Sequence, residues 1–457
     1  MLYWSMYKSI KSQNFFIVIV SYVFYGWWNV KFLFLIALTS FLSFFSGVLI
    51  ARIRFICSHS DESVIPKVLM IVNVVINLLI LGIFKYYNFF IDNLVDLFAV
   101  MGIRLQLTTL QWILPVGISF YTFQALSYTI DVYKEKINAT RDIIAFFAYV
   151  SFFPQLVAGP IERATNLLPQ FLEKRTFCYE KAVNGMRQIL WGFFMKVVIA
   201  DNCAGIVNVI FEHYEQVHWT MLILGALLFT FQIYGDFAGY SNIAIGCARL
   251  FGFNLMENFK TPYFSSNISE FWRRWHISLN TWFRDYVYIP MGGNRKGKLR
   301  QTINILIVFA MSGLWHGANW TYVTWGIWHG IWAAVQTNKN SVSKRGVMVG
   351  LTFVLVVIGW IIFRSESITQ AVVYFYGICC LQDGWGLSSL GISHIQTFGT
   401  LGFILLLMLS EYITGERAHP LVVVPQNLVL RWGLYILLVM VILCFPGKSE
   451  TFIYFQF

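Results

Sequence analysis

A histidine lies inside one of the most apolar parts of this chain. His316 stands in SGLWHGANW, residues 312–320. An ionisable side chain in a membrane segment is costly, so it marks a functional site by default. An imidazole titrates near neutral pH and can take a proton from a hydroxyl. We therefore expect His316 to act as a general base at the bottom of a membrane-buried tunnel. The alternative is a histidine that only joins helices through hydrogen bonds.

The residues around His316 fit such a site. Gly313 and Gly317 permit close backbone approach or a break in a helix. Trp315 and Asn319 lie one and three residues from the histidine and are expected to line the tunnel.

A second histidine stands in a basic, aromatic stretch, FWRRWHISLNTWFRDYVYI, residues 271–289. Its aromatic residues recur at close to helical spacing, which predicts one amphipathic helix. Basic, tryptophan-rich helices usually lie in the membrane interface. His276 and Asn280 are four residues apart and share a face of that helix. Together with Trp272 they are expected to position substrate at the tunnel mouth. The alternative is an interfacial anchor whose histidine makes a structural hydrogen bond.

Three charged residues lie inside other apolar segments. Asp236 is surrounded by small residues in FQIYGDFAGYSNIAIG, and small residues let helices approach closely. It is therefore expected to face protein or a wet cavity and to line the substrate path. Lys196 and Asp201 occupy an earlier segment. Such charges also suit a transporter, which remains an alternative of another class, although no internal repeat supports it. His329 is a weaker catalytic candidate, and the other histidines are expected in surface loops: His59, His213, His218, His394 and His419.

The sequence lacks the signatures of several other chemistries. It has no nucleophile elbow, P-loop or HExxH motif, so direct transfer by a lone base, without a covalent enzyme intermediate, fits better. The seven cysteines show neither metal-ligand nor disulfide spacing, and no metal or tightly bound cofactor is expected. The net charge of +11 reports topology and contact with anionic lipid rather than binding of nucleic acid.

The elements that hold these residues are predicted to be membrane helices. Of 457 residues, 58% are hydrophobic and 12% charged, whereas a soluble domain carries roughly 25% charged residues. The mean hydropathy is +0.64. Segments of about 20 apolar residues recur along the chain, which predicts an all-α polytopic bundle of about ten to twelve passes with an uncleaved first span. Residues 110–133 mix Pro115, Gly117 and several hydroxyls, which predicts a broken or buried helix.

The charges of the loops predict the orientation. Basic residues gather between positions 260 and 300, so this region is expected on the cytoplasmic side. Arg52 and Arg54 indicate the same side for the first loop. Within the basic region, MGGNRKGK, residues 291–298, is either a flexible turn or a contact for the phosphates of a donor.

Five stretches together resemble the membrane-bound O-acyltransferase (MBOAT) superfamily and, within it, the bacterial alginate O-acetylation branch. They are FFPQLVAGPIERATNLLPQF, FQIYGDFAGYSNIAIGCARLFGF, SEFWRRWHISLNTWFRDYVYIPMGGNRKG, SGLWHGANWTYVTWGIWHG and the terminal FIYFQF. The resemblance implies a funnel or tunnel surrounded by spanning, interfacial and re-entrant helices. It implies one membrane-embedded domain, residues 1–457, with a catalytic core of about 110–335. It also implies that His316 is catalytic and that His276 is the second functional histidine.

The resemblance further implies a reaction. An acyl group, expected to be acetyl, leaves a cytoplasmic thioester donor, either acetyl-CoA or an acyl carrier protein. It crosses the cytoplasmic membrane to a partner protein outside, which passes it to a polysaccharide. A sister branch transfers D-alanyl groups from a carrier protein to teichoic acid, and that reaction remains the alternative. AGPIERATNLLPQF and the terminal FIYFQF favour the acetylation branch.

Overall fold

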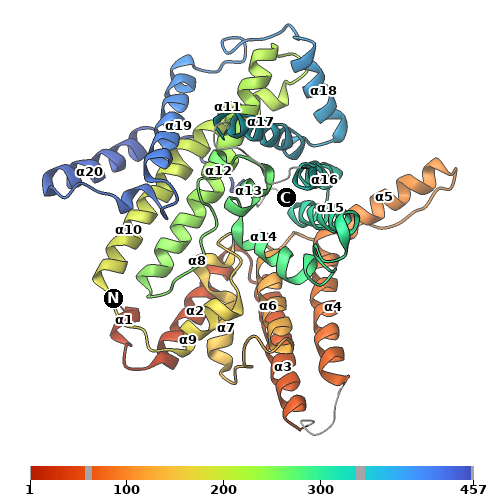
Figure 1. Cartoon of the computed structure of the whole chain (residues 1–457), viewed down its shortest axis with the longest axis vertical. Coiled ribbons are helices and arrows are strands. Elements are labelled where there is room, and N and C mark those ends of the chain that lie inside the picture. Colours follow the sequence, from red (N-terminus) through yellow and green to blue (C-terminus); the bar gives the residue numbers. More distant parts are fainter. Residues whose placement is uncertain (1, 57–63, 336–344, 454–457) are drawn as a thin grey trace. The chain divides into compact units, whose positions relative to one another are not determined.

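The described part of the protein is helical (Figure 1). A computed structural model describes residues 2–56, 64–335 and 345–453. The chain divides into two compact units, one of residues 1–183 with 247–256 and the other of residues 184–246 with 257–457. Together with the apolar helices described below, this confirms the predicted all-α membrane architecture. His59 and the last four residues of the FIYFQF ending lie outside the described residues.

The first unit holds the N-terminal helices. They are α1 (Leu2–Ser5), α2 (Ile10–Trp28), α3 (Phe32–Ile56), α4 (Ile65–Lys85), α5 (Tyr87–Val100), α6 (Ile118–Tyr133), α7 (Ile143–Ser151), α8 (Phe153–Leu156), α9 (Ala164–Leu172) and the start of α10 (Tyr179–Phe193). α3, α4 and α6 lie side by side, and α5 extends away from the end of α4 (Figure 1). α6 begins after Gly117, whose φ of 73° is left-handed, and nearly all its side chains are buried. The helix predicted for residues 110–133 to be broken or buried is therefore confirmed as buried over residues 118–133, whereas residues 110–117 are not helical.

The second unit holds the two candidate histidines. After the end of α10 it contains η1 (Phe194–Ala200), α11 (Asp201–Glu212), most of α12 (Trp219–Leu250), η2 (Pro262–Phe264), α13 (Ile268–Arg274), α14 (Ile277–Phe283), η3 (Arg284–Tyr288), α15 (Gly297–His316), α16 (Trp320–Val335), α17 (Arg345–Arg364), α18 (Ile368–Cys379), α19 (His394–Thr414), η5 (Pro420–Val422) and α20 (Leu428–Cys444). The long apolar stretch from residue 219 to 251, which had room for more than one helix, forms the single helix α12.

Glycines allow α12 to pack closely in this unit. A Cβ on Gly192 of α10 would lie 2.6 Å from the Gly239 oxygen, and one on Gly239 of α12 would lie 2.9 Å from the Gly192 oxygen. One turn away, a Cβ on Gly235 would lie 2.8 Å from the Met195 oxygen. Small residues thus bring α12 against α10 and η1 at backbone distance, as expected for helices packed within a membrane.

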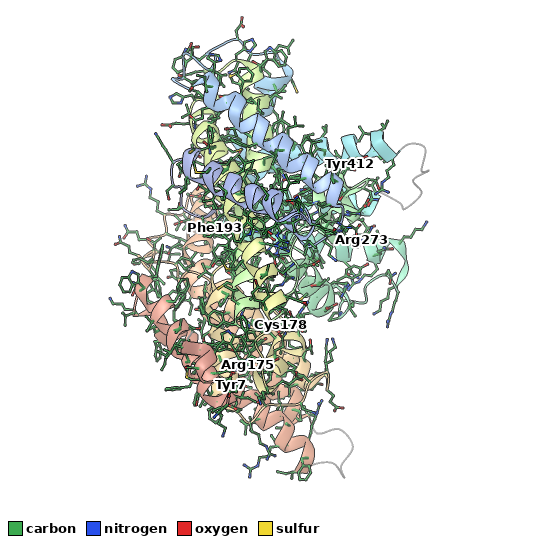
Figure 2. The ribbon with its side chains drawn as sticks, turned by 90° about the vertical axis from the view of Figure 1, so that its left-hand side faces the viewer. Tyr7, Arg175, Cys178, Phe193, Arg273 and Tyr412 are labelled. Atoms are coloured by element: carbon green, nitrogen blue, oxygen red, sulfur yellow. The ribbon has the colours of Figure 1, made fainter. Side chains whose placement is uncertain are left out.

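Six helical segments among the described residues are long and apolar enough to cross a membrane: α3, α4, residues 179–212, α12, α17 and α19. α18 and α20 are apolar but shorter. The exposed side chains of these segments include large apolar ones such as Phe193 and Tyr412 (Figure 2), as expected where lipid replaces water. The prediction of about ten to twelve passes also counts α2, α15 and α16, whose polar ends or shorter length keep them outside this group.

Candidate active site

His316 is the last residue of α15, and two glycines let the next helix fold back against it. A Cβ on Gly313 would lie 2.1 Å from the Tyr322 carbonyl oxygen, and one on Gly317 would lie 2.2 Å from the Tyr322 ring. No side chain fits at either position. α15 and α16 consequently form a tight hairpin (Figure 1), and the imidazole of His316 is buried where α15 ends. The helix break predicted around His316 is confirmed.

His276 lies at a second break, where one continuous interfacial helix was predicted. The structure divides residues 268–288 into α13, α14 and the π-helical η3, so the prediction of one helix was wrong. His276 has a φ of 45° and a ψ of 51°, the left-handed conformation that a non-glycine residue seldom adopts. Strain of this kind persists only where surrounding contacts hold it, and it gathers at functional sites. The tryptophans of this region, including Trp272 and Trp275, are buried in the core of the unit rather than arrayed along an interface.

Asn258 holds the strained turn in place. Its carbonyl oxygen accepts a hydrogen bond from the Ile277 N–H at 3.0 Å. Its Oδ1 lies 3.2 Å from His276 Nδ1 and accepts bonds from the Ser278 N–H at 3.3 Å and the Ser278 hydroxyl at 2.9 Å. Its amide nitrogen donates to the Ser241 hydroxyl at 3.3 Å, which fixes the orientation of the amide. Because Oδ1 can only accept, Nδ1 of His276 carries the proton, and Nε2 is the basic nitrogen.

The two histidines meet in a shell of aromatic rings. Their ring centroids are 6.2 Å apart. Trp315 lies against both, at 5.1 Å from His316 and 5.9 Å from His276. Trp325 lies 5.1 Å and Phe363 5.6 Å from the His316 ring. The structure therefore brings His276 of one sequence motif together with Trp315 and His316 of another.

Burial favours the neutral form of His276, whose side chain is fully enclosed. Desolvation, and next the charge of a protonated His316, hold the pKa of His276 well below its ordinary value of 6.5. The imidazole is therefore neutral at physiological pH, with Nε2 able to accept a hydrogen bond from a hydroxyl.

A cavity of about 320 Å³ lies between α13, α14, η3, α15 and α16. Trp272 and Asn280, both predicted to bind substrate, line it together with Arg284, Phe309 and Ser312. Ser312 is one helical turn before His316 on α15, so both side chains project from the same face. The cavity thus reaches from the basic region of the sequence to within one turn of the candidate base.

Asn280 also shapes the turn that carries His276. Its amide nitrogen donates to the carbonyl oxygens of Trp272 at 2.8 Å, Trp275 at 2.6 Å and His276 at 3.2 Å. The predicted relation between His276 and Asn280 therefore exists, but through the backbone of a break rather than along one helix face.

Two other predicted residues have structural partners of their own. Asn319 precedes α16, accepts a bond from the Thr321 N–H at 3.0 Å and donates to the Glu366 carbonyl at 2.9 Å. Asp236 is buried and bonded to Lys196 and to the Ile453 N–H. Roles for Asn319 and Asp236 in binding substrate stay predictions.

Sequence reasoning missed Asn258 and Phe237, which contact His276, and it misplaced His419. Asn258 belongs to no motif that signals chemistry, and Phe237, whose ring lies edge-on 4.6 Å from His276, looked like ordinary core. His419, expected in a surface loop, is buried and lines a small cavity together with Asn258 and Glu411. That prediction was wrong.

Comparison with known proteins agrees with this geometry. The family model of the membrane-bound O-acyltransferases matches residues 27–338, and these residues include both histidines and the cavity. The chain belongs to this family, and its activity is O-acyl transfer.

Several curated proteins are similar over most of the chain. A protein of Pseudomonas putida named probable alginate O-acetylase AlgI is 41% identical over 83% of this chain and 77% of its own length. A peptidoglycan O-acetyltransferase of Helicobacter pylori is 32% identical over 83% of this chain and 75% of its own length. A teichoic acid D-alanyltransferase of Bacillus subtilis is 29% identical over 50% of this chain and 60% of its own length.

Proposed function

We propose that this enzyme takes an acetyl group from a cytoplasmic thioester and transfers it for O-acetylation of a polysaccharide outside the cytoplasmic membrane. His316 is the general base, and His276 positions the hydroxyl that attacks. The observation that carries the proposal is the pair of buried imidazoles 6.2 Å apart, one of them held neutral with its basic nitrogen defined.

The reaction needs only one base and one positioned acceptor. His316 takes the proton of the attacking hydroxyl while the oxygen forms a bond to the thioester carbonyl carbon. The C–S bond then breaks, and the departing thiolate receives the proton from the His316 imidazolium. His276 Nε2 accepts a hydrogen bond from the same hydroxyl and sets its direction. The aromatic shell excludes water, which would otherwise hydrolyse the thioester.

The cavity beside Ser312 supports a thioester donor. Its walls are mostly apolar, with Phe309 and Trp272 among them, while Arg284 and Asn280 supply polar groups. This combination suits an extended, uncharged arm that ends in a thioester and is attached to an anionic carrier. Basic residues between positions 260 and 300 match the negative charge of either acetyl-CoA or an acyl carrier protein.

The comparisons support an acetyl group and a cell-surface polymer. Relatives named for acetylation of alginate and of peptidoglycan match over 83% of the chain, whereas the D-alanyltransferase matches over 50%. We infer that the acceptor is a polysaccharide, reached through a partner protein outside the membrane. D-alanyl transfer to teichoic acid is the second candidate, because the Bacillus subtilis relative named for that reaction is 29% identical over 50% of this chain.

The test uses the purified enzyme in nanodiscs with radiolabelled acetyl-CoA, or with an acetylated or D-alanylated carrier protein. Wild type is compared with His316→Ala and with His329→Phe, which alters another buried histidine of the same hairpin. We expect donor turnover by wild type and His329→Phe and at least a hundredfold loss in His316→Ala. Equal turnover by His316→Ala would overturn the assignment of the base, and turnover of the D-alanyl donor alone would establish the second candidate.

A further inference from the structure

A charged cluster is buried at the junction of η1, α11 and α12. Lys196 Nζ lies 2.7 Å from Asp201 Oδ1 and 2.8 Å from Asp236 Oδ1. The carboxylate side chains of Asp201 and Asp236 are only 8% and 5% exposed. Burying such groups is costly, and a buried ion pair is by itself weak evidence for stability. A role for the cluster must therefore explain why these charges are kept in spite of the free energy of desolvation.

The partners of the cluster include the last described residues of the chain. Asp236 Oδ2 accepts a hydrogen bond from the Ile453 N–H at 2.7 Å. Lys196 Nζ donates to the Glu450 carbonyl at 3.3 Å. Lys196 is shared by two carboxylates, so Asp236 takes its further partner from the backbone of the tail, defined here as residues 445–453.

The start of the tail is fixed against the same helices. The Gly447 N–H donates to the Val197 carbonyl at 3.2 Å, and the Asn202 amide donates to the Phe445 carbonyl at 3.0 Å. A Cβ on Gly447 would lie 2.3 Å from the Asp201 backbone. The π-helical turn of η1 supplies the Val197 carbonyl and the Lys196 ammonium together. The tail is thus attached at its beginning by backbone contacts and at its end by Asp236.

The end of the tail reaches the neighbour of His276. Phe452 is buried, with its ring 5.1 Å from Tyr240 and 6.3 Å from Phe237. Phe237 follows Asp236 on α12, and its ring lies edge-on to His276 at 4.6 Å. One turn of α12 therefore binds the tail through the hydrogen bond to Asp236 and contacts the candidate site through the Phe237 ring.

We infer that Lys196 and Asp236 are positioning residues that hold the tail against α12 and thereby keep Phe237 against the His276 imidazole. The inference rests on the proposed function for its kinetic consequence, but the contacts themselves are independent of it. Under this inference the intramembrane charges hold the tail in place, so they do not require a transporter. It also places Asp236 outside the substrate path that its sequence surroundings suggested.

Two measurements test the inference. The first follows the tail: Ile453→Cys is treated with N-ethylmaleimide, alone and together with Asp236→Ala, and labelling of the C-terminal peptide is measured by mass spectrometry. Ile453 is buried, so we expect slow labelling with Asp236 present and at least tenfold faster labelling with Asp236→Ala. Unchanged labelling would overturn the anchor.

The second measurement follows acyl transfer. A displacement of about 1 Å at a reacting centre costs about a hundredfold in rate, so Asp236→Ala is expected to lower kcat by about 10- to 100-fold. KM for the donor should change less than about twofold, since the donor cavity does not contain the tail. Asp236→Asn keeps an oxygen that accepts from Ile453, and we expect it to recover most of kcat. A loss in KM alone, or no recovery, would overturn the positioning role.

Asp201→Asn is the matched control, because it removes a charge at the same distance from Lys196 while the hydrogen bond from the Ile453 N–H remains. An equal loss of kcat in Asp201→Asn would assign the effect to charge in the cluster and overturn the inference. Ile453→Pro deletes the same hydrogen bond from the tail side and replaces Asp236→Ala if that variant fails to accumulate. If wild type transfers no acyl group, the proposed function fails, whereas the labelling still decides whether Asp236 holds the tail.

Discussion

Replacing Asn258 by aspartate should change how the enzyme responds to acid. Asn258 Oδ1 lies 3.2 Å from His276 Nδ1, so Asn258→Asp puts a negative charge beside that ring while keeping the acceptor. An opposite charge within about 6 Å moves a pKa by about one to three units toward the charged form. The pKa of His276, which burial holds well below 6.5 in wild type, is therefore raised. On acidification His276 Nε2 is protonated earlier and can no longer accept a hydrogen bond from the attacking hydroxyl.

The assay is kcat/KM for acyl transfer between about pH 5 and pH 8. In wild type the acidic limb should come from the general base alone, which must be unprotonated to work. In Asn258→Asp the protonation of His276 is moved to higher pH, so the fall should be steeper and begin at higher pH than in wild type. Ser278→Ala is the control, because it removes a hydrogen bond of 2.9 Å to the same Oδ1 without adding a charge. An acidic limb at the same pH in wild type and Asn258→Asp would refute the assignment of His276 as a neutral acceptor.

The burial of His276 also predicts a dependence of stability on pH. In the unfolded chain the pKa of His276 returns to about 6.5, whereas in the folded chain it is lower. Below pH 6.5 the unfolded state therefore binds a proton that the folded state does not. Stability is full above pH 6.5 and is lost as pH falls, by up to about 1.4 kcal/mol per pH unit. Asn258→Asp should weaken this dependence, as measured by thermal unfolding in detergent.

Asn258→Leu removes the acceptor altogether. It leaves two fixed and buried donors, His276 Nδ1–H and the Ser278 N–H, without their shared partner. Each such loss costs about 1–3 kcal/mol, so the free energy of unfolding should fall by about 2–6 kcal/mol. A melting temperature equal to that of wild type would show that the amide does not hold the turn.

Two further predictions concern the hairpin of α15 and α16. Gly313→Ala places a Cβ 2.1 Å from the Tyr322 carbonyl oxygen, so α15 and α16 must separate. This variant should lower both the folded yield and acyl transfer. Gly350→Ala is the control, because its Cβ would have no heavy atom within 4 Å, and it should affect neither. His329 is buried among the rings of Phe271, Trp272, Trp325 and Trp360, and neither of its ring nitrogens has a hydrogen-bond partner within the described residues. His329→Phe should therefore keep acyl transfer and change the free energy of unfolding by less than about 1.5 kcal/mol. A loss of acyl transfer in a normally folded variant would contradict this.

The sequence singled out the candidate histidines but did not predict the local structure around His276. His316 was singled out because an ionisable side chain is costly in an apolar segment, and His276 because it stands in a basic, aromatic stretch and in a motif that resembles the family. The break at His276 was not predicted, because two short helices joined at a left-handed residue carry nearly the same spacing of aromatic residues as one continuous helix. Hydrophobic periodicity records which side chains face inward and does not record a single reversed φ angle.

The partners of the histidines were beyond sequence reasoning for a different reason. Asn258 contacts His276 from 18 positions earlier in the chain, in a loop of ordinary composition. An asparagine in a loop is usually a turn residue. Its role follows from four hydrogen bonds that converge on it in the folded unit, and no local pattern encodes that convergence.

The intramembrane charges show that the free-energy cost of burying a charge does not identify the function of the charged residue. The rule that buried charges mark function identified Lys196, Asp201 and Asp236 correctly as unusual, and it suited a transporter as well as an enzyme. Cost shows that a group is retained for a reason but does not say which reason. The hydrogen bond from the Ile453 N–H to Asp236 Oδ2 favours the role that we infer, because a carboxylate bonded to the backbone is suited to hold the tail in place. The role inferred for Asp236 therefore follows from its partners and not from its charge alone.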